Sequence, residues 1–459
     1  MAACEPWIPD VEGESLNGKV LVIVRTSSPA RVAVVEQLWQ LGVKIVMIHP
    51  FYNKIFFHYT ASWINCETDD VESMYEQILD TLQKPPFNRE DGVPDGVMTL
   101  DDYAVYPCAL LAKKFKQRPL PLDNKDLKTT MDKELFRDHC LAHDIAAPLF
   151  AVVHRGECAS QKVKEHKHGM DYPIVMKCSS GAGKMQTKLC RNAKELDEHA
   201  DVMWDYIDTK IPEGVKKAIL AHGEQMKILL EEFIGGDEVD IDCVVHNGEV
   251  LFAPVSDNFA TEPPFFAEQG GLIPSQLPED AQLSLVNLLK DWVKSYGTKV
   301  SGVLHFEAKY DPTRPRRSYI IEVNTRLGGA ESFMMVRAAY GVELGECMAR
   351  LALGMHPFRT GKQPQLCPKT KLLPIPSRHC ASVNILPPAG GGVLSEVRLP
   401  REGEKGLVCA QCINMGIRVY GPPRDFACVV WLVASGETGT EAQENLKNLS
   451  KQVLIKCIP

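Results

Sequence analysis

The chain has 459 residues, enough for two to four packed units, and 45% of them are hydrophobic. Its formal net charge is −8 and it has no long run of lysine and arginine, so a nucleic-acid-binding surface is not indicated. The first residues lack a basic segment followed by an apolar core, and no window reaches 18 consecutive apolar residues. We therefore expect a soluble, cytoplasmic protein that does not insert into a membrane.

The 15 cysteines are scattered without the spacing of a disulfide framework, as expected for reduced thiols in a reducing compartment. Cys409 and Cys412 form a single CxxC pair, and no second pair or CxxH partner follows at zinc-finger spacing. The pattern is therefore only a weak indication of a metal or redox role.

The N-terminal part alternates buried strands with helices. Residues 19–24 and 43–48 are continuous apolar runs, and residues 31–41 between them predict a helix. Another apolar strand is predicted just before Asp101 and Asp102, with a helix after it. This order predicts a doubly wound, parallel α/β lobe. No G-x-G-x-x-G motif follows its first strand, so dinucleotide binding is not supported, and we expect the lobe to form one wall of a cleft.

The middle of the chain changes to shorter, mixed elements. Residues 125–150 are predicted to be helical, with Thr130 or Asp132 near the start of the helix, and strands are expected from Tyr172 onward. Asn247-Gly248 is the dipeptide that favours a tight hairpin between two strands. Residues 332–353 are expected to form a helix, and the last part mixes short strands with a helix at 440–453.

The most informative stretch is I-I-E-V-N-T-R-L-G-G-A-E at residues 320–331. If it begins as a strand, Glu322, Asn324 and Arg326 share one face because side chains alternate. Two oxygen donors followed by a fixed cation suit a divalent metal that carries polyphosphate, since Mg²⁺ binds hard oxygen ligands and keeps substrate phosphates in its shell. The alternative is an ordinary solvated sheet face.

A second carboxylate is predicted beside this strand. Residues 301–310 alternate in the same way and carry Glu307. The turn-forming sequence D-P-T-R-P-R-R follows, so an antiparallel hairpin would bring Glu307 next to Glu322. Two adjacent carboxylates repel each other unless a cation lies between them, which favours a metal site.

A small-residue loop follows Lys177, which ends a predicted strand. Glycine backbone can approach phosphate oxygens closely, and a lysine supplies charge. A complete P-loop is excluded because Cys178 and Met185 stand where glycine and a hydroxyl residue are required. A plain hairpin turn would explain the same glycines. The candidate phosphate residues of this loop are Ser179, Ser180, Gly181 and Gly183.

The stretch L-L-E-E-F-I-G-G-D-E ends a strand with two glycines before Glu238. Free backbone groups at such a strand end can pair with the edge of an adenine, and Glu238 is placed to accept ribose hydroxyls. The alternative is an acidic edge strand that charge protects from aggregation.

The order of these motifs is more specific than any one of them. Lys133 in D-K-E-L-F-R comes first, followed by Lys177, E-E-F-I with Glu238, Glu307, and finally E-x-N-x-R. In this order and at these intervals the chain resembles the ATP-grasp superfamily over about residues 120–355. H-F-E-A-K-Y followed by I-I-E-V-N-T-R-L-G-G is most similar to its amino-acid and dipeptide ligase branch, which includes carnosine synthase.

The resemblance implies both α/β and α+β parts: a parallel-sheet lobe, an ATP-grasp fold of two α+β subdomains, and a C-terminal lid. The expected boundaries are 1–120 for the N-terminal domain, 121–225 for the subdomain with the phosphate loop, 226–358 for the subdomain with the adenine and metal sites, and 359–459 for the C-terminal lid or accessory domain.

The resemblance also implies a role for each residue. Lys133, Lys177 and the Ser179–Gly183 loop would hold phosphates. Glu231, Glu232, Phe233 and Ile234 would meet adenine largely through backbone, and Glu238 would bind ribose. Mg²⁺, with Mn²⁺ as an alternative, would be held by Glu307, Glu322 and Asn324, and Arg326 would hold the carboxylate or its acyl-phosphate.

The implied reaction activates a carboxylate with ATP as an acyl-phosphate, which an amine then attacks to give an amide, ADP and phosphate. We expect small-molecule carboxylate and amine partners, no nucleic acid or membrane partner, and a homodimer contact as one role for the last 80 residues. Alternatives are a carboxylase-type or purine-pathway ATP-grasp enzyme, or a nucleotide-binding scaffold without turnover. The sequence does not choose the substrates.

Overall fold

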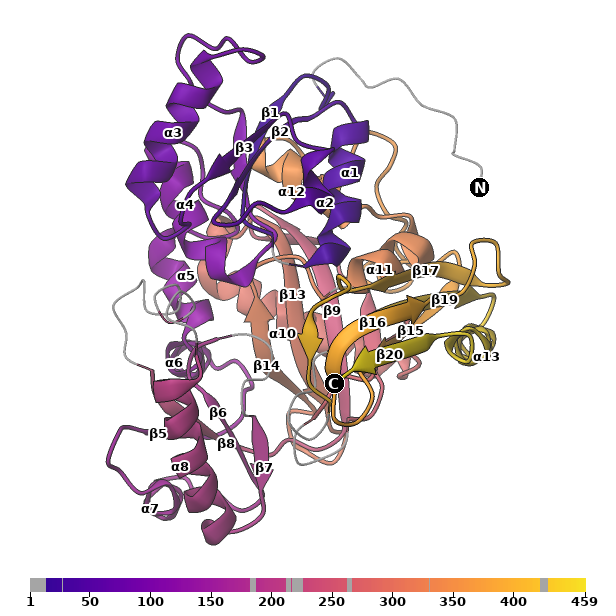
Figure 1. The fold of residues 1–459 in the computed structure, drawn as a ribbon. Coiled ribbons are helices and arrows are strands. Elements are labelled where there is room, and N and C mark those ends of the chain that lie inside the picture. Colours follow the sequence, from indigo (N-terminus) through magenta and orange to yellow (C-terminus); the bar gives the residue numbers. More distant parts are fainter. Residues whose placement is uncertain are drawn as a thin grey trace.

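The computed structural model describes residues 14–26, 28–181, 187–211, 216, 226–261, 266–329, 331–421 and 428–459. Figure 1 shows a central body flanked by an N-terminal lobe above, a smaller lobe below, and the C-terminal strands at one side. No helix in these ranges is long and apolar enough to cross a membrane.

The N-terminal lobe is a four-stranded parallel sheet with strand order β3-β2-β1-β4. The two predicted apolar runs form β1 and β2, and every residue of β1 is buried. The sequence did not show β3, because it is short and only one of its four residues is buried. The elements of this lobe are β1 (Val20–Val24), α1 (Val32–Gln40), β2 (Lys44–His49), α2 (Lys54–Phe57), β3 (Ser62–Asn65), α3 (Val71–Gln83), β4 (Gly96–Met98) and α4 (Val105–Lys114).

The segment predicted as one helix at 125–150 is two helices and a strand. Asp132 ends α5 (Asn124–Met131) and caps α6 (Lys133–Ala142), where its carboxylate accepts hydrogen bonds from the N–H groups of Glu134 and Leu135. This cap fixes Lys133 at the first position of α6.

The lower lobe is an antiparallel sheet with strand order β5-β8-β6-β7, covered by two helices. Its core is closed by apolar residues of β6, β8 and α8. Its elements are β5 (Phe150–Val153), α7 (Ala159–Lys164), β6 (Ile174–Cys178), β7 (Lys188–Cys190), α8 (Ala193–Thr209) and β8 (Ile228–Glu232).

The central body is a nine-stranded sheet with the order β14-β13-β9-β11-β12-β15-β19-β17, and β10 pairs with β9. The predicted Asn247-Gly248 hairpin joins β9 to β10, and both residues have positive φ. The predicted hairpin of β13 and β14 is also present, with Glu307 opposite Glu322. The elements of the central body from β9 to β14 are β9 (Asp237–His246), β10 (Glu249–Phe252), β11 (Val255–Asn258), β12 (Gly271–Ile273), α10 (Glu279–Tyr296), β13 (Gly302–Tyr310) and β14 (Ser318–Asn324).

The helix predicted at 332–353 is two helices, α11 (Ser332–Tyr340) and α12 (Leu344–Ala352). Gly341 adopts a left-handed conformation with φ of 68° directly after α11, which ends the helix. These helices pack with residues of β1 and α1 in one hydrophobic cluster, so the N-terminal lobe and the central body share a core.

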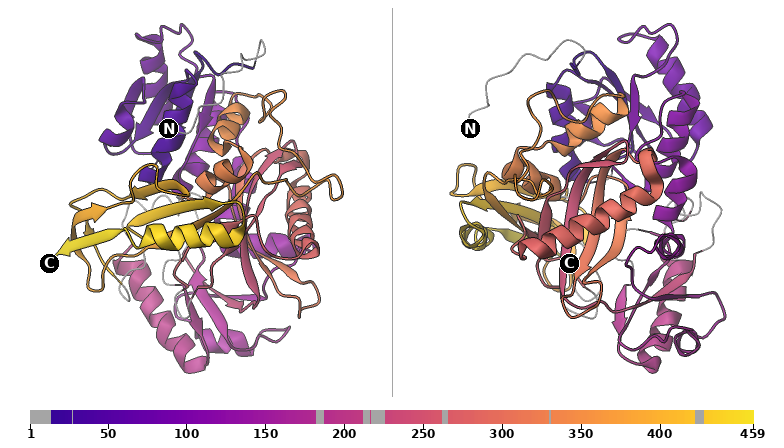
Figure 2. Two further views of the ribbon diagram at one scale, coloured as in Figure 1. Left: turned by 90° about the vertical axis from the view of Figure 1, so that its right-hand side faces the viewer. Right: turned by 180° about the vertical axis from the view of Figure 1, so that it is seen from behind.

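The C-terminal part continues the central sheet, because β15 pairs with β12 across the boundary that we expected at 358/359. Three of its strands, β16, β18 and β20, form a separate small sheet that projects from the body (Figure 2). The elements are β15 (His379–Ile385), β16 (Gly392–Arg398), β17 (Leu407–Cys412), β18 (Arg418–Val419), β19 (Val430–Gly436), α13 (Gly439–Ser450) and β20 (Leu454–Ile458).

This architecture confirms the predicted fold class: a parallel α/β lobe followed by antiparallel α+β parts. The three boundaries between the expected domains stay predictions.

Candidate active site

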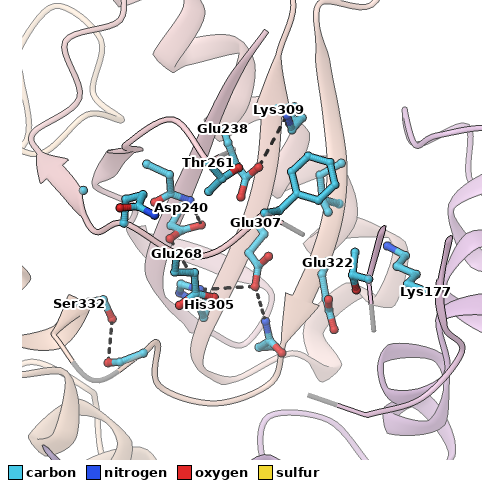
Figure 3. Close-up of a pocket in the computed structure, with 18 of the residues that line it drawn as sticks. Lys177, Glu238, Asp240, Thr261, Glu268, His305, Glu307, Lys309, Glu322 and Ser332 are labelled. Carbon is cyan, nitrogen blue, oxygen red and sulfur yellow. Dashed lines mark hydrogen bonds and ion pairs between the residues drawn. The ribbon is translucent and has the colours of Figure 1, made fainter. Parts of the chain in front are cut away.

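A cavity of about 560 Å³ lies where the two lobes, the central sheet and the C-terminal strand β15 meet. Of the predicted site residues that the structure describes, every one lines it except Ser179. Figure 3 shows Glu307 and Glu322 in the middle of this cavity, with Lys177 facing Glu322 from the lower lobe and Asp240, Glu268 and Ser332 toward the other end.

The floor of the cavity is one face of three adjacent strands. Alternate residues of β9 and β13, such as Ile241 and Phe306, enter the hydrophobic core, so the residues between them face the cavity. The strand register then places Glu307 opposite both Asp240 and Glu322. The same register pairs His305 with Asp242 and Asn324, and Lys309 with Glu238.

The predicted metal ligands lie together on this floor. The Asn324 amide donates to a Glu307 oxygen at 2.9 Å, and Lys133 Nζ lies 3.1 Å from Glu322 Oε1. Burial alone would raise the pKa of Glu322, but Lys133 and then Lys177 hold it below its ordinary value. Glu322 is therefore ionised at neutral pH, as a metal ligand must be.

Within the described residues no group of three or more His, Cys, Asp and Glu is arranged to hold a metal by itself. The residues present nevertheless fit Mg²⁺ brought in with phosphates, because two carboxylates and one amide oxygen are hard donors that leave ligand positions for phosphate oxygens. Glu307 and Glu322 would hold the ion, with Asn324 beside them, once the Asn324 amide presents its oxygen.

The two predicted phosphate lysines have different surroundings. Lys133 Nζ donates to the Gly181 carbonyl at 3.2 Å in addition to its contact with Glu322. Lys177 Nζ lies 2.7 Å from Glu231, a carboxylate that also accepts from Arg137 Nε at 2.7 Å. Burial lowers the pKa of Lys177 although Glu231 opposes this effect. Lys177 thus faces the cavity on a rigid, buried ion-pair network.

The loop after Lys177 contributes Ser180 and Gly181 to the cavity wall. Ser179 is fully buried instead: its hydroxyl accepts from the Lys227 N–H, and its carbonyl accepts from the Lys133 N–H. Gly183 lies outside the described residues. Ser179 therefore holds the start of the loop against the first residue of α6, Lys133, which is one of the two predicted phosphate lysines.

The predicted adenine residues lie where β8 ends. β8 is paired on both sides over Glu231, so the backbone of that residue is used within the sheet. Arg314, from the turn of the β13–β14 hairpin, contacts Glu232 at 3.1 Å and donates to the Phe233 carbonyl at 3.3 Å. Ile234 follows, and its backbone has no hydrogen-bond partner in the part of the chain that the structure describes. Ile234 is thus the best-placed backbone for a base edge.

Arg326 follows β14 and is held from two sides. Its Nε lies 2.7 Å from Asp102 of the N-terminal lobe, and its Nη1 donates to the Leu327 carbonyl at 2.7 Å. The same loop is held by Arg31, whose Nη2 donates to the carbonyls of Leu327 and Gly328 at 3.1 and 2.5 Å. The N-terminal lobe therefore fixes the position of Arg326 through two side chains.

We expect Arg31→Met to raise the KM of the carboxylate substrate that the resemblance implies about tenfold, because two buried carbonyls lose their donor and the loop that carries Arg326 loosens. The free energy of unfolding should fall by about 1–3 kcal/mol. Steady-state kinetics and thermal denaturation of this variant and of Arg31→Lys measure both effects. A KM equal to that of the wild type would show that Arg31 supports only the fold.

The sequence reasoning missed Asp240 and His305, which line the cavity, and Asp242, which is buried beside His305. Asp242 lies 3.1 Å from His305 Nδ1, and it also accepts from the Gly328 N–H at 3.1 Å. Burial opposes protonation of His305, but Asp242 and Asp240 raise its pKa to about 10. The alternation in D-E-V-D-I-D was a signal that could have placed both aspartates on the face of Glu238. No such local signal exists for Arg31, Asp102 and Arg137, because each of them contacts a segment that is distant in the sequence.

Comparison with known proteins assigns the class. Residues 170–333, which include Lys177, β8, the three floor strands and Arg326, match the family described as ATP-grasp domain. The predicted resemblance to this superfamily is thus confirmed over these residues.

Particular relatives narrow this class. Carnosine synthase 1 of Gallus gallus is 36% identical over 186 residues, which cover 40% of this chain and 19% of that protein. The chain matches less than half the length of the carnosine synthases. The crystal structure of an L-amino acid ligase from Bacillus licheniformis has a TM-score of 0.77 at 20% identity and covers 96% of this chain and 100% of the ligase. Part of this chain is thus similar in sequence to carnosine synthase, and the likeness to the L-amino acid ligase shows the fold.

A third relative is the biotin carboxylase domain of a 2-oxoglutarate carboxylase from Hydrogenobacter thermophilus, solved with magnesium ADP, ADP and bicarbonate. Its TM-score is 0.67 at 15% identity, over 95% of this chain and 90% of that domain. At this identity the likeness shows the fold alone.

Proposed function

We propose that this protein is an ATP-dependent, ADP-forming ligase that activates the carboxylate of an amino acid as an acyl-phosphate and joins it to an amine. The observation that carries the proposal is the floor of the cavity, where Glu307 and Glu322 face each other beside Asn324 and Arg326. This set combines anionic oxygens for a metal with a guanidinium for a carboxylate in one cavity. The similarity to carnosine synthase and to the L-amino acid ligase supports the substrate class.

The cavity is divided by charge in a way that suits this reaction. Lys177 faces the floor from the lower lobe, and Lys133 lines the cavity at the start of α6, so the phosphates of ATP would lie between these lysines and the two glutamates. Mg²⁺ bound there would neutralise the β- and γ-phosphates. Phosphoryl transfer requires positioning and charge neutralisation more than a protein nucleophile, and the described part of the cavity supplies both.

Arg326 has the geometry of a carboxylate anchor. Two of its nitrogens are fixed by Asp102 and Leu327, while Nη2 has no hydrogen-bond partner among the described residues. A carboxylate bound there would lie beside the metal ligands, so one of its oxygens could attack the γ-phosphorus and displace ADP. The amine would then attack the acyl carbon, phosphate would leave, and the amine would lose a proton.

Protection of the acyl-phosphate also agrees with the architecture. An acyl-phosphate hydrolyses when water reaches it, and this cavity lies between two lobes and the C-terminal strand β15 rather than on an open surface. The cytoplasmic location, the homodimer contact and the use of Mn²⁺ stay predictions.

The direct test is the release of ADP and phosphate from ATP by the purified chain with pairs drawn from the twenty amino acids, β-alanine and small amines, followed by mass spectrometry of the product. We expect ADP and phosphate in equal amounts and a product whose mass is the sum of the two substrates less one water. ADP formation that requires bicarbonate and no amine would instead assign a carboxylase. The absence of ADP with every pair, in a chain that still binds magnesium ATP, would assign a scaffold.

A further inference from the structure

Beyond Glu307 the cavity ends in an acidic region, the acidic end, which we define by Asp240, Glu268, Glu331 and Asn384. These residues come from four separate places in the chain: β9, the segment before β12, the residue before α11, and β15. Glu268 lies at the exposed rim, and Glu331 is partly buried. Figure 3 shows Asp240 and Glu268 on the side of Glu307 away from Glu322 and Lys177.

The lysines and arginines that line the cavity are paired elsewhere. Contacts of 2.7 to 3.7 Å join Lys177 to Glu231, Arg326 to Asp102, Lys133 to Glu322 and Lys309 to Glu238. In the described ranges no lysine or arginine lies within 4.0 Å of Glu331. Burial, then Glu268, raises the pKa of Glu331 to about 7, and the Asn384 side chain opposes the shift. The acidic end therefore lacks a counter-charge of its own around Glu331.

Asn384 gives a second, independent observation. The residue is only 7% exposed, it lines the cavity, and its Oδ1 is buried and accepts no hydrogen bond from any residue that the structure describes. A buried carbonyl oxygen without a donor costs about 1–3 kcal/mol, so such a group usually indicates a missing partner. Among the described residues Asn384 Oδ1 therefore lacks a hydrogen-bond donor, and Glu331, to which the Asn384 side chain hydrogen-bonds, lacks a positive partner.

We propose that the acidic end is a subsite for a protonated nitrogen of a substrate, held by Glu331 and Asn384 with Asp240 and Glu268 around it. An ammonium group has three donors and one positive charge, which matches two carboxylates and one carbonyl oxygen. This inference rests on the proposed function, and it narrows the substrates to compounds that carry a cationic nitrogen in addition to the group that reacts.

The bound nitrogen cannot be the attacking amine. A nitrogen held as ammonium between carboxylates has no lone pair, whereas attack on an acyl-phosphate requires a neutral amine. The ammonium thus serves recognition. It belongs either to the carboxylate substrate, which would then be an amino acid, or to an amine substrate with a second positive nitrogen.

Matched substrate pairs test the proposal in the 459-residue chain. They also show whether the bound ammonium belongs to the carboxylate substrate or to the amine substrate. One arm compares 3-aminopropanoate with propanoate as the carboxylate, and the other compares 1,4-diaminobutane with 1-aminobutane as the amine. We expect a KM at least about tenfold lower for the ammonium-bearing member in one arm, because a charge-assisted hydrogen bond contributes about 1.5–3 kcal/mol. In Glu331→Gln and in Asn384→Leu this ratio should fall to within about threefold.

The matched control is Glu396→Gln, an exposed glutamate of β16 whose partner is Lys456. This variant should keep the wild-type ratio. Equal KM values for both members of both pairs in the wild type would overturn the subsite, and so would an unchanged ratio in folded Glu331→Gln.

Calorimetry separates this proposal from the proposed function. The same four compounds are titrated into the full-length chain with magnesium ADP present, where no turnover is needed. Tighter binding of the ammonium members, lost in Glu331→Gln, would support the subsite even if no pair of substrates produced ADP. Equal affinity for the ammonium-bearing compound and its matched compound in both pairs would overturn the subsite, even if a ligase activity were found.

Discussion

Glu322→Gln is expected to lower kcat for ADP formation by at least about 10²-fold, the scale on which a single group that stabilises transition-state charge contributes. Glu322 lies opposite Glu307 on the neighbouring strand, and its charge is maintained by Lys133 and Lys177. Glutamine keeps the size of the side chain and one oxygen but removes the charge that a divalent ion requires. ADP formation as a function of Mg²⁺ at fixed ATP measures the change, and the Mg²⁺ needed for half-maximal rate should rise.

The fold should survive this substitution with a small cost. Lys133 loses its charged partner at 3.1 Å, but it keeps its hydrogen bond to the Gly181 carbonyl. Because the Glu322 side chain is 25% exposed, solvent screens the pair, and we expect a loss of roughly 1 kcal/mol, which thermal denaturation can measure. Glu279→Gln, which removes the charge of an exposed partner of Lys369, is the matched control and should retain the wild-type Mg²⁺ dependence. Near-normal turnover of Glu322→Gln at low Mg²⁺ would contradict the metal assignment.

Alternation and turn chemistry explain how much of the site could be predicted from the sequence. Glu307 and Glu322 could be paired because each strand has one apolar and one polar face and the turn between the strands is rich in proline. The same rule failed for the segment 125–150, where Asp132 caps a new helix inside a region of continuous helical pattern. A cap of this kind uses local hydrogen bonds, which hydrophobic periodicity does not register.

The parts that sequence reasoning missed are contacts between distant segments. Arg31 reaches the carbonyls of Leu327 and Gly328, and Arg137 shares Glu231 with Lys177. These arginines stand in ordinary helical surroundings, and only the packing of the lobes gives them a partner. Ser179 shows the converse case, because a residue chosen for a phosphate loop is buried where the loop begins and holds β6 against α6.

Arg326→Lys is expected to raise the KM of the carboxylate substrate by about tenfold to a hundredfold, while the KM of ATP changes little. The guanidinium is planar and can bind Asp102 through Nε, the Leu327 carbonyl through Nη1, and a substrate carboxylate through its remaining N–H groups. A lysine ammonium is a point charge that cannot satisfy all three in this geometry. Initial rates at saturating ATP with a varied carboxylate substrate measure the effect.

The contact between Arg326 and Asp102 explains why Arg326→Lys should weaken carboxylate binding although the positive charge is kept. With a lysine at position 326, the ammonium would be drawn to the nearest fixed carboxylate, which is Asp102, and away from the substrate. Asp102→Asn in the Arg326→Lys background should therefore recover part of the lost affinity for the carboxylate. Arg337→Lys, at an exposed arginine of α11 that contacts Glu343 at 2.8 Å, is the matched control. If Arg326→Lys leaves the carboxylate KM unchanged, Arg326 does not hold the substrate, and its contacts with Asp102 and Leu327 serve only to dock the N-terminal lobe.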